Sequence, residues 1–267
     1  MIDGRRSRLD EANARWREML AHWAIPEEIQ HAAPASPHFF DPAVFAKAAD
    51  DALERSADSP SDEAARASLP RCGAILDVGC GAGAASLRLR PHRLTGIDPN
   101  QALLDELVRR ARRLEIETST VQGLWPDDAD HCPVADVIVC HHVLYNVADL
   151  AAFATALDAH ARERIVVEAT TVHPLSWTAP YWRELHGLVR PDRPTVDDAL
   201  AVLETSNRRV HIERWVRRYP PVDAADPMAV ARLARRLCLP DARHDELRTL
   251  LNRFPVPTER EVATLWW

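Results

Sequence analysis

The stretch AILDVGCGAG, residues 74–83, decides the fold class of this chain. It begins with a short apolar run that carries one acid, Asp77, near its end, which is typical of a buried strand. Three of the chain's eight glycines follow within five residues. Glycine permits a tight turn and a close approach of a ligand to the backbone, because no Cβ intervenes. The stretch therefore predicts a strand, a glycine-rich turn and a helix that starts at the turn.

Further strands and helices alternate along the chain after this turn. Helical patterns are followed or preceded by short apolar segments, and this rhythm predicts βαβ units and a parallel sheet. The additional strands are expected at 94–98, 117–123, 134–140, 164–170, 208–218 and 260–267, with helices at 101–114 and 148–160 between the earlier ones. We therefore predict an α/β fold with a seven-stranded, doubly wound, mostly parallel sheet.

Helical segments flank the predicted sheet. Residues 1–69 carry an apolar stripe at three- and four-residue spacing, then a helix with Asp41 as its cap and a short helix with Ser61 as its cap. We predict that these residues form an N-terminal helical cover over the domain at 70–267. That domain is expected to hold helical insertions at about 172–206 and 220–254.

Composition narrows the range of partners and compartments. The chain has 267 residues and a formal net charge of −7, which disfavours binding to bulk nucleic acid. Its five cysteines form no CxxC pair, so neither a disulfide framework nor a metal site is expected. The first residues contain no apolar signal region, and no run of about 18 apolar residues follows. We expect a cytoplasmic protein that does not contact the membrane.

The spacing of the glycines indicates the kind of ligand. A dinucleotide fingerprint has the spacing GxGxxG and binds a pyrophosphate. Here the spacing is GxGxG, and the acid Asp77 precedes it. S-adenosylmethionine (SAM) has no phosphate and carries an ammonium and a sulfonium, so an acid suits it and would repel a pyrophosphate. A second acid, Asp98, ends the next strand, where a carboxylate can accept hydrogen bonds from both ribose hydroxyls. Asp98 alone would also suit NAD.

These residues resemble the class I SAM-dependent methyltransferases. The resemblance rests on ILDVGCGAG, LTGIDPNQALLDE and ADVIVCHHVLYNV, is closest to the small-molecule branch, and covers roughly residues 70–170. It implies that Asp77 orients the glycine loop, that Asp98 binds the ribose and that Pro99 lies beside the adenine. It also implies that Gly79, Gly81 and Gly83 lie under the methionine portion of SAM. Gly123, Leu124 and Trp125 would flank the adenine. Cys140 and His141 would lie near the transferring methyl.

One position departs from the pattern of that family. Members often carry an acid after the third strand that binds the adenine amino group, whereas this chain has Leu124 and Trp125, with Asp127 further on. Stacking or a backbone contact would have to replace the acid. This departure keeps a second hypothesis open, that of a degenerate SAM-binding module that acts through a partner.

The acceptor side is predicted from the residues after the fourth strand. His142 is the favoured general base and Tyr145 a positioning residue, with Glu168 and His173 as secondary candidates. A base is needed only when the acceptor is protonated. An aromatic acceptor wall is expected from the cover and the first insertion, formed by Phe39, Phe40, Phe45, Trp177, Tyr181 and Trp182.

The leading hypothesis is an enzyme that transfers a methyl group from SAM to a small organic molecule, leaving S-adenosylhomocysteine. O-, N- and C-methylation all remain open. An NAD-dependent oxidoreductase is disfavoured by the glycine spacing and by Asp77. A nucleic-acid or protein methyltransferase is disfavoured by the acidic balance and by the lack of an Asn-Pro-Pro-Tyr type motif.

Overall fold

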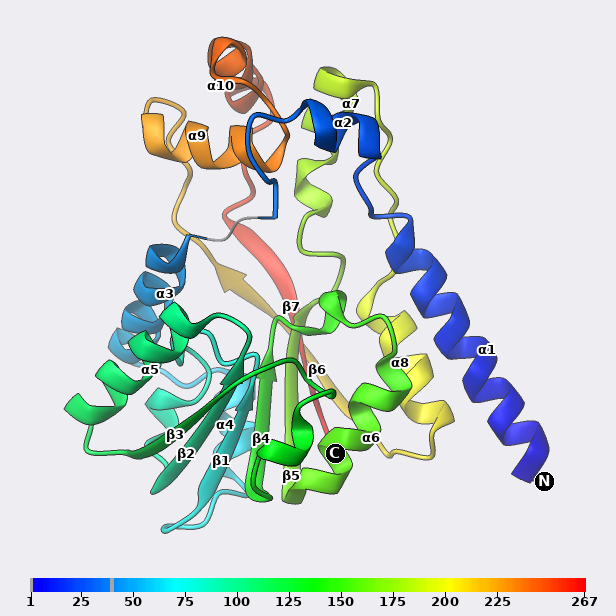
Figure 1. The fold of residues 1–267 in the computed structure, drawn as a ribbon, viewed down its shortest axis with the longest axis vertical. Helices are drawn as coiled ribbons and strands as arrows, with labels where there is room; N and C mark the ends of the chain where they lie inside the picture. The colour runs from blue at the N-terminus through cyan, green and yellow to red at the C-terminus, as the bar shows by residue number, and fades with distance from the viewer. Residues whose placement is uncertain (1, 39–40) are drawn as a thin grey trace.

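The computed structural model describes residues 2–38 and 41–267, and a seven-stranded sheet forms its centre (Figure 1). The strand order is β3-β2-β1-β4-β5-β7-β6, and β7 runs antiparallel to both of its neighbours. The strands are β1 (Ala74–Val78), β2 (Arg93–Asp98), β3 (Glu117–Gln122), β4 (Ala135–His141), β5 (Ala161–Thr170), β6 (His211–Arg218) and β7 (Glu259–Trp266). The predicted α/β fold with a mostly parallel sheet of seven strands is confirmed.

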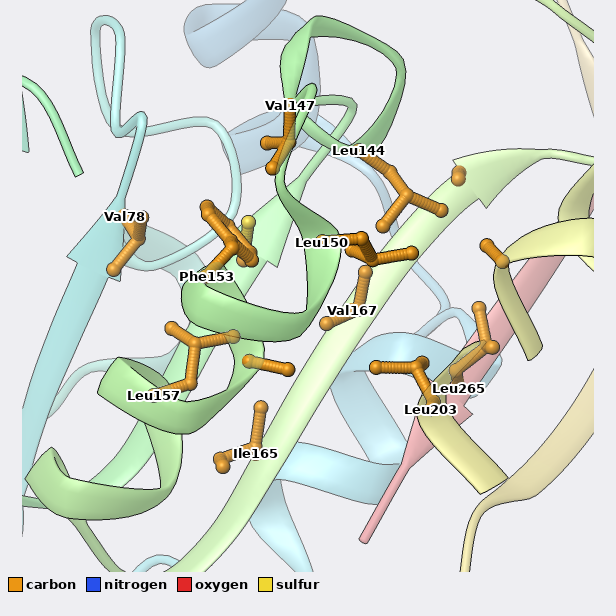
Figure 2. Packing of buried hydrophobic residues seen from close by; sticks show 14 of the residues in the cluster. Val78, Leu144, Val147, Leu150, Phe153, Leu157, Ile165, Val167, Leu203 and Leu265 are labelled. Carbon is orange, nitrogen blue, oxygen red and sulfur yellow. The ribbon is translucent and has the colours of Figure 1, made fainter. Parts of the chain in front are cut away.

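One face of the sheet is covered by three helices that are far apart in the sequence. They are α1 (Ile2–Ala21), α6 (Leu150–His160) and α8 (Val196–Thr205). Trp16 of α1 is fully buried among the apolar side chains of α6, α8 and β5. Figure 2 shows Phe153 and Leu157 of α6 turned toward the sheet residues Val78 and Ile165. Burial of this core fixes the strands beneath α6.

The opposite face is covered by α3 (Pro42–Glu54), α4 (Pro60–Arg66) and α5 (Gln101–Arg113). Leu104 and Leu107 of α5 pack on the first strands, whereas Ala64 and Ala65 of α4 pack near β5. The residues before β1 therefore cover both faces of the sheet, since α1 lies on one face and α3 and α4 on the other (Figure 1).

Four helices form a separate apolar cluster beyond the carboxyl-terminal ends of the parallel strands, and we call this part the roof (Figure 1). They are α2 (Glu27–Ala32), α7 (Ala179–His186), α9 (Pro227–Arg236) and α10 (His244–Arg253). Tyr181, Trp182 and Leu185 of α7 pack there against leucines of α9 and α10. The two predicted insertions thus supply three of the four roof helices.

The predicted helix after the glycine turn is wrong. Only the 3-10 turn η1 (Leu87–Leu89) forms there, because Arg90 adopts a left-handed conformation, with φ 53°, and β2 already begins at Arg93. Further 3-10 turns are η2 (Ala129–His131), η3 (Leu144–Asn146), η4 (Ser176–Thr178) and η5 (Asp241–Arg243). The glycine turn is therefore held by loop contacts rather than by the first turn of a helix.

The predicted cap of the third helix is also wrong by two residues, whereas Asp41 caps α3 as predicted. Ser59 caps α4, because its side chain and that of Asp62 form a reciprocal capping box, and Pro60 takes the first helical position. Ser61 lies inside the first turn, where its hydroxyl is directed at the sheet. Among the helices of the described residues, none combines the length and apolar character needed to span a membrane.

Candidate active site

The glycine loop lies at the carboxyl-terminal ends of β1 and β2. Gly79, Gly81 and Gly83 all have positive φ angles, of 68°, 49° and 91°. The amides of Gly79 and Cys80 donate to the Ile97 carbonyl at 2.9 and 3.1 Å, which holds the loop against β2. A Cβ on Gly79 would lie 2.4 Å from the Val143 side chain, whereas one on Gly81 would meet only the Phe45 ring at 3.6 Å. The loop is therefore open on the side where Gly81 lies.

Asp98 ties this loop to the next strand. Its Oδ2 accepts from the Gly81 amide and its Oδ1 from the Asn100 amide, both at 2.9 Å. The side chain is largely buried, and each carboxylate oxygen has a second lone-pair direction to offer. Asp98 is thus oriented at the end of β2 and can still accept hydrogen bonds from a ligand.

Asp77 lies under the loop and not on its surface. It is 1% exposed, and its Oδ2 accepts a 2.6 Å hydrogen bond from the Ser86 hydroxyl. Its Oδ1 is shielded from water and has no hydrogen-bond partner. Burial raises the pKa of Asp77 to about 7, the hydrogen bond from Ser86 opposes that rise, and the charge of Asp98 adds to it. A cation placed above the loop would favour the ionised form of this carboxyl.

The residues after β3 divide between the surface and the core. Leu124 is 56% exposed, and its amide donates to the Asp128 carboxylate. Trp125 turns toward α6, where its indole nitrogen donates to the Phe153 carbonyl at 3.3 Å. The exposed Pro99 accepts a hydrogen bond from Gln122 through its carbonyl. Gly123 and Leu124 therefore lie at the strand edge next to Asp98, whereas the ring of Trp125 is used in packing.

The end of β4 presents two histidines in different settings. The Cys140 thiol is fully buried in the core under α6, so only its backbone faces the edge. Burial lowers the pKa of His141 to about 4, in spite of the nearby Glu168 carboxylate, so this imidazole is neutral near pH 7. His142 is exposed and adopts a left-handed backbone conformation with φ 61°. Such a conformation is strained for a residue with a Cβ, so the surrounding loop must hold His142 in place.

Glu168 on β5 connects His142 to three other elements. This carboxylate is 0% exposed and meets the Arg217 guanidinium of β6 at 2.8 Å and the His142 Nε2 at 3.0 Å. Its Oε2 also accepts from the Ser61 hydroxyl of α4 at 2.8 Å, and Ser61 reaches Thr264 of β7 at 2.7 Å. Burial alone would raise the pKa of Glu168, but the facing His141, His142 and Arg217 hold it well below its usual range. We call Ser61, His142, Glu168, Arg217 and Thr264 the Glu168 cluster.

Two arrangements of protons fit the contacts of His142. The Arg217 guanidinium lies 2.9 Å from Nε2 and can donate to it, and the Nε2 proton can instead be donated to Glu168. In the second arrangement the Nδ1 lone pair is free to accept a proton from an acceptor molecule. Arg217 and Ser61 were not predicted as site residues, because Arg217 is 75 positions from His142 and Ser61 is 107 positions from Glu168.

The other predicted acceptor-side residues lie elsewhere. The Tyr145 hydroxyl donates to the Thr170 carbonyl at 2.8 Å on the α6 side of the sheet, and its role in positioning stays a prediction. His173 stacks on Trp23 with ring centroids 3.7 Å apart, and burial lowers its pKa to about 3. Neither Tyr145 nor His173 belongs to the Glu168 cluster.

The predicted aromatic wall is only partly assembled at the strand edge. Phe45 lies beside Gly81, and Trp177 lies under the roof, whereas Tyr181 and Trp182 are buried within the roof. Phe39 and Phe40 fall outside the described residues. Within residues 2–38 and 41–267, no three acid, histidine or cysteine side chains converge as metal ligands would.

Comparisons with known proteins agree with this geometry. Residues 76–164 match the sequence model of a family described as a methyltransferase domain. The YcgJ protein from Bacillus subtilis shares the fold at 15% identity and a TM-score of 0.53, over 81% of this chain and 97% of that one. A SAM-dependent methyltransferase from Geobacter sulfurreducens, solved with S-adenosyl-L-homocysteine, does so at 16% identity and a TM-score of 0.50, over 82% and 97%. No curated protein sequence matches the chain significantly.

The matched segment contains the glycine loop, Asp77 and Asp98, and the end of β4. The match of this segment indicates an enzyme of the methyltransferase class. Residues 76–164 therefore match a methyltransferase domain, and the chain shares its fold with a SAM-dependent methyltransferase.

Proposed function

We propose that this enzyme transfers the methyl group of SAM, bound at the glycine loop, to a small organic acceptor at the carboxyl-terminal ends of β4 and β5. The observation that carries the proposal is the joining of Asp98 to the open side of the glycine loop through the Gly81 amide. This contact forms a cradle between two strand ends, where α/β sheets bind their ligands.

The residues present fit SAM in their chemistry. Gly81 leaves open space where a side chain would intrude, and Asp98 retains acceptor capacity for ribose hydroxyls. The unpartnered Oδ1 of Asp77 gives the region under the loop a latent negative charge, which suits a ligand with two positive groups. Gly79 and Gly83 shape the loop, and Gly123, Leu124 and Pro99 are the residues nearest to an adenine beside Asp98. The backbone of Cys140 and the ring of His141 would line the methionine side.

Bound SAM supplies a methyl group on a sulfonium, which is already a good leaving group. The protein therefore has to align the acceptor and exclude water rather than activate the donor. His142 supplies a base for a protonated acceptor, because Glu168 can hold the Nε2 proton and leave Nδ1 free. Arg217 neutralises Glu168, so the dyad adds no net charge to the site.

A small acceptor is favoured by the roof and by the charge of the chain. Roof helices from three parts of the sequence lie beyond the strand ends and so flank the place proposed for the acceptor (Figure 1). The net charge of −7 disfavours a nucleic-acid acceptor.

Thermal shift measurements with SAM, S-adenosylhomocysteine and NAD test the donor. A ligand at a hundredfold excess over its dissociation constant stabilises by about 2.7 kcal/mol, so SAM should raise the melting temperature and NAD should not. Release of S-adenosylhomocysteine with a panel of small acceptors then separates an enzyme from a module that only binds SAM. Stabilisation by NAD alone would overturn the proposal.

Substitution of Asp98 tests the position of the ribose. Asp98→Ala should weaken SAM binding by at least about tenfold, because charge-assisted hydrogen bonds contribute about 1.5–3 kcal/mol each. Calorimetric titration of SAM measures the change, and Asp105→Ala on the exposed side of α5 is the matched control. Equal affinities in the two variants would show that the ribose lies elsewhere.

A further inference from the structure

Arg260, the second residue of β7, lies under the roof between two aromatic rings. The centre of its guanidinium is 5.3 Å from the Trp177 ring and 4.7 Å from the Tyr219 ring. Its Nε is shielded from water and has no hydrogen-bond partner. Burial lowers the pKa of Arg260, and the nearby Tyr219 opposes this shift only in part.

Arg260 also lacks the acidic partner that its neighbours have. Arg217, which lies opposite it on β6, pairs with Glu168, and the adjacent Arg218 pairs with Glu259. Across the described parts of the chain, no carboxylate oxygen lies within 4 Å of the Arg260 guanidinium. A partly buried cation is costly unless an anion meets it, and this chain has more acids than bases. A missing partner is therefore not explained by composition.

The position of Arg260 relates it to the candidate base. Arg260 and Arg217 are register partners in the β6–β7 pair, and Arg217 contacts the Nε2 of His142 at 2.9 Å. Arg260 lies four residues before Thr264 on β7, so both side chains lie on the face of the sheet that holds the Glu168 cluster, and Arg217 lies opposite Arg260 on the same face. A molecule that reached Arg260 with one end could present its other end to His142.

We propose that Arg260 binds the carboxylate of the methyl acceptor, so that the substrates of this enzyme are small organic acids. The inference rests on the proposed function, because it assigns one end of the acceptor in the same site. A guanidinium offers a planar fork of N–H donors that matches one carboxylate. A phosphate dianion would need a second free cation, and Arg217 is already neutralised by Glu168. The Trp177 and Tyr219 rings flank the guanidinium and hold it in place.

Binding of benzoate and benzamide to the protein saturated with S-adenosylhomocysteine tests the assignment. The two probes have the same shape and differ in charge, and calorimetric titration gives both affinities. We expect benzoate to bind at least about tenfold more tightly than benzamide, as loss of a charge-assisted hydrogen bond implies. Arg260→Gln should remove that preference, and Arg260→Lys should keep part of it. Arg218→Gln, an exposed change on the neighbouring strand, should keep all of it.

The outcomes separate the two proposals. Affinity for S-adenosylhomocysteine is measured first in every variant, and an unchanged value shows that the fold and the donor site are intact. Equal binding of the two probes, absence of benzoate binding, or an unaltered benzoate affinity in Arg260→Gln would each overturn the role of Arg260 and leave the donor site standing. Failure of the wild-type protein to bind S-adenosylhomocysteine would instead overturn the proposed function.

Discussion

Gly79, Gly81 and Gly187 all have positive φ angles, yet their surroundings differ sharply. A Cβ added to Gly79 would lie 2.4 Å from the Val143 side chain, and one added to Gly81 would meet only Phe45, at 3.6 Å. A Cβ added to Gly187, at the end of α7, would have no atom within 4 Å. We expect Gly187→Ala to cost about 1–2 kcal/mol for backbone strain alone, and Gly79→Ala to cost more because a clash adds to the strain. Gly81→Ala should cost about as much as Gly187→Ala but also weaken SAM binding.

Urea unfolding and SAM titration of the three variants measure these effects. Gly187→Ala is the control, because its strain is similar and it lies in the roof, away from the glycine loop. Undiminished SAM affinity in Gly81→Ala would contradict the assignment of Gly81 to the open side of the loop.

Asp77 should make stability depend on pH. Its pKa is raised from 3.8 to about 7 in the folded protein, so this group favours folding below pH 4 and loses that contribution as the pH rises to about 7. The shift corresponds to about 4 kcal/mol in total, from 1.36 kcal/mol per unit of pKa. Asp77→Asn cannot ionise, so its free energy of unfolding should not fall in this way. The variant should therefore become more stable relative to the wild type as the pH rises from 5 to 8. Free energies of unfolding in urea at several pH values measure this difference, with Asp105→Asn as control. A difference that is the same at every pH would contradict the assigned burial of the carboxyl.

At the scale of secondary structure, periodicity predicted the strands and most helices well. Apolar runs such as those of β1 and β4 are buried on both faces, and burial leaves few alternatives to a strand. The helix expected after the glycine turn failed because its residues are buried loop rather than one amphipathic face. The cap of α4 was misplaced because both Ser59 and Ser61 suit a helix start. In the structure Ser59 forms the capping box with Asp62, whereas Ser61 contacts Glu168.

The Glu168 cluster joins elements, and its loss should weaken their packing. Glu168→Gln leaves the Arg217 guanidinium partly buried without its anion, which should cost about 3 kcal/mol. Glu163→Gln, on the exposed first part of the same strand, should cost less than about 0.5 kcal/mol. Urea unfolding of both variants compares them directly. Equal stabilities would show that Glu168 does not hold β5, β6 and α4 together.

At the scale of the whole molecule, α1 ties the sheet to the roof (Figure 1). Trp16 is 0% exposed, and its indole nitrogen donates to the Val147 carbonyl. Trp16→Ala should cost about 3–5 kcal/mol, because it leaves a cavity and an unpaired carbonyl. Arg17→Ala, whose exposed pair with Asp149 contributes at most about 1 kcal/mol, is the control. Thermal unfolding measures both, and equal melting temperatures would mean that α1 is not docked on the α6 face.

The donor half of the site could be predicted from the sequence, and the acceptor half only in part. Asp77, the glycines and Asp98 lie close together in the chain, so a local pattern contains them. His142 was predicted from its place after β4, but its partners Arg217 and Ser61 come from distant segments that no periodicity connects to it. Arg260 belongs to the same group, since only the pairing of β6 with β7 brings it near His142.

The place of β7 in the sheet sets the order in which the molecule can be completed during synthesis. This strand leaves the ribosome after the other strands of the sheet, yet it lies between β5 and β6. Until it arrives, the edge of β5 has no partner on that side, and β6 has no sheet to join. A nascent chain that stalls before residue 259 therefore presents an apolar, unpaired edge, which is the kind of surface that chaperones shield and that aggregation exploits.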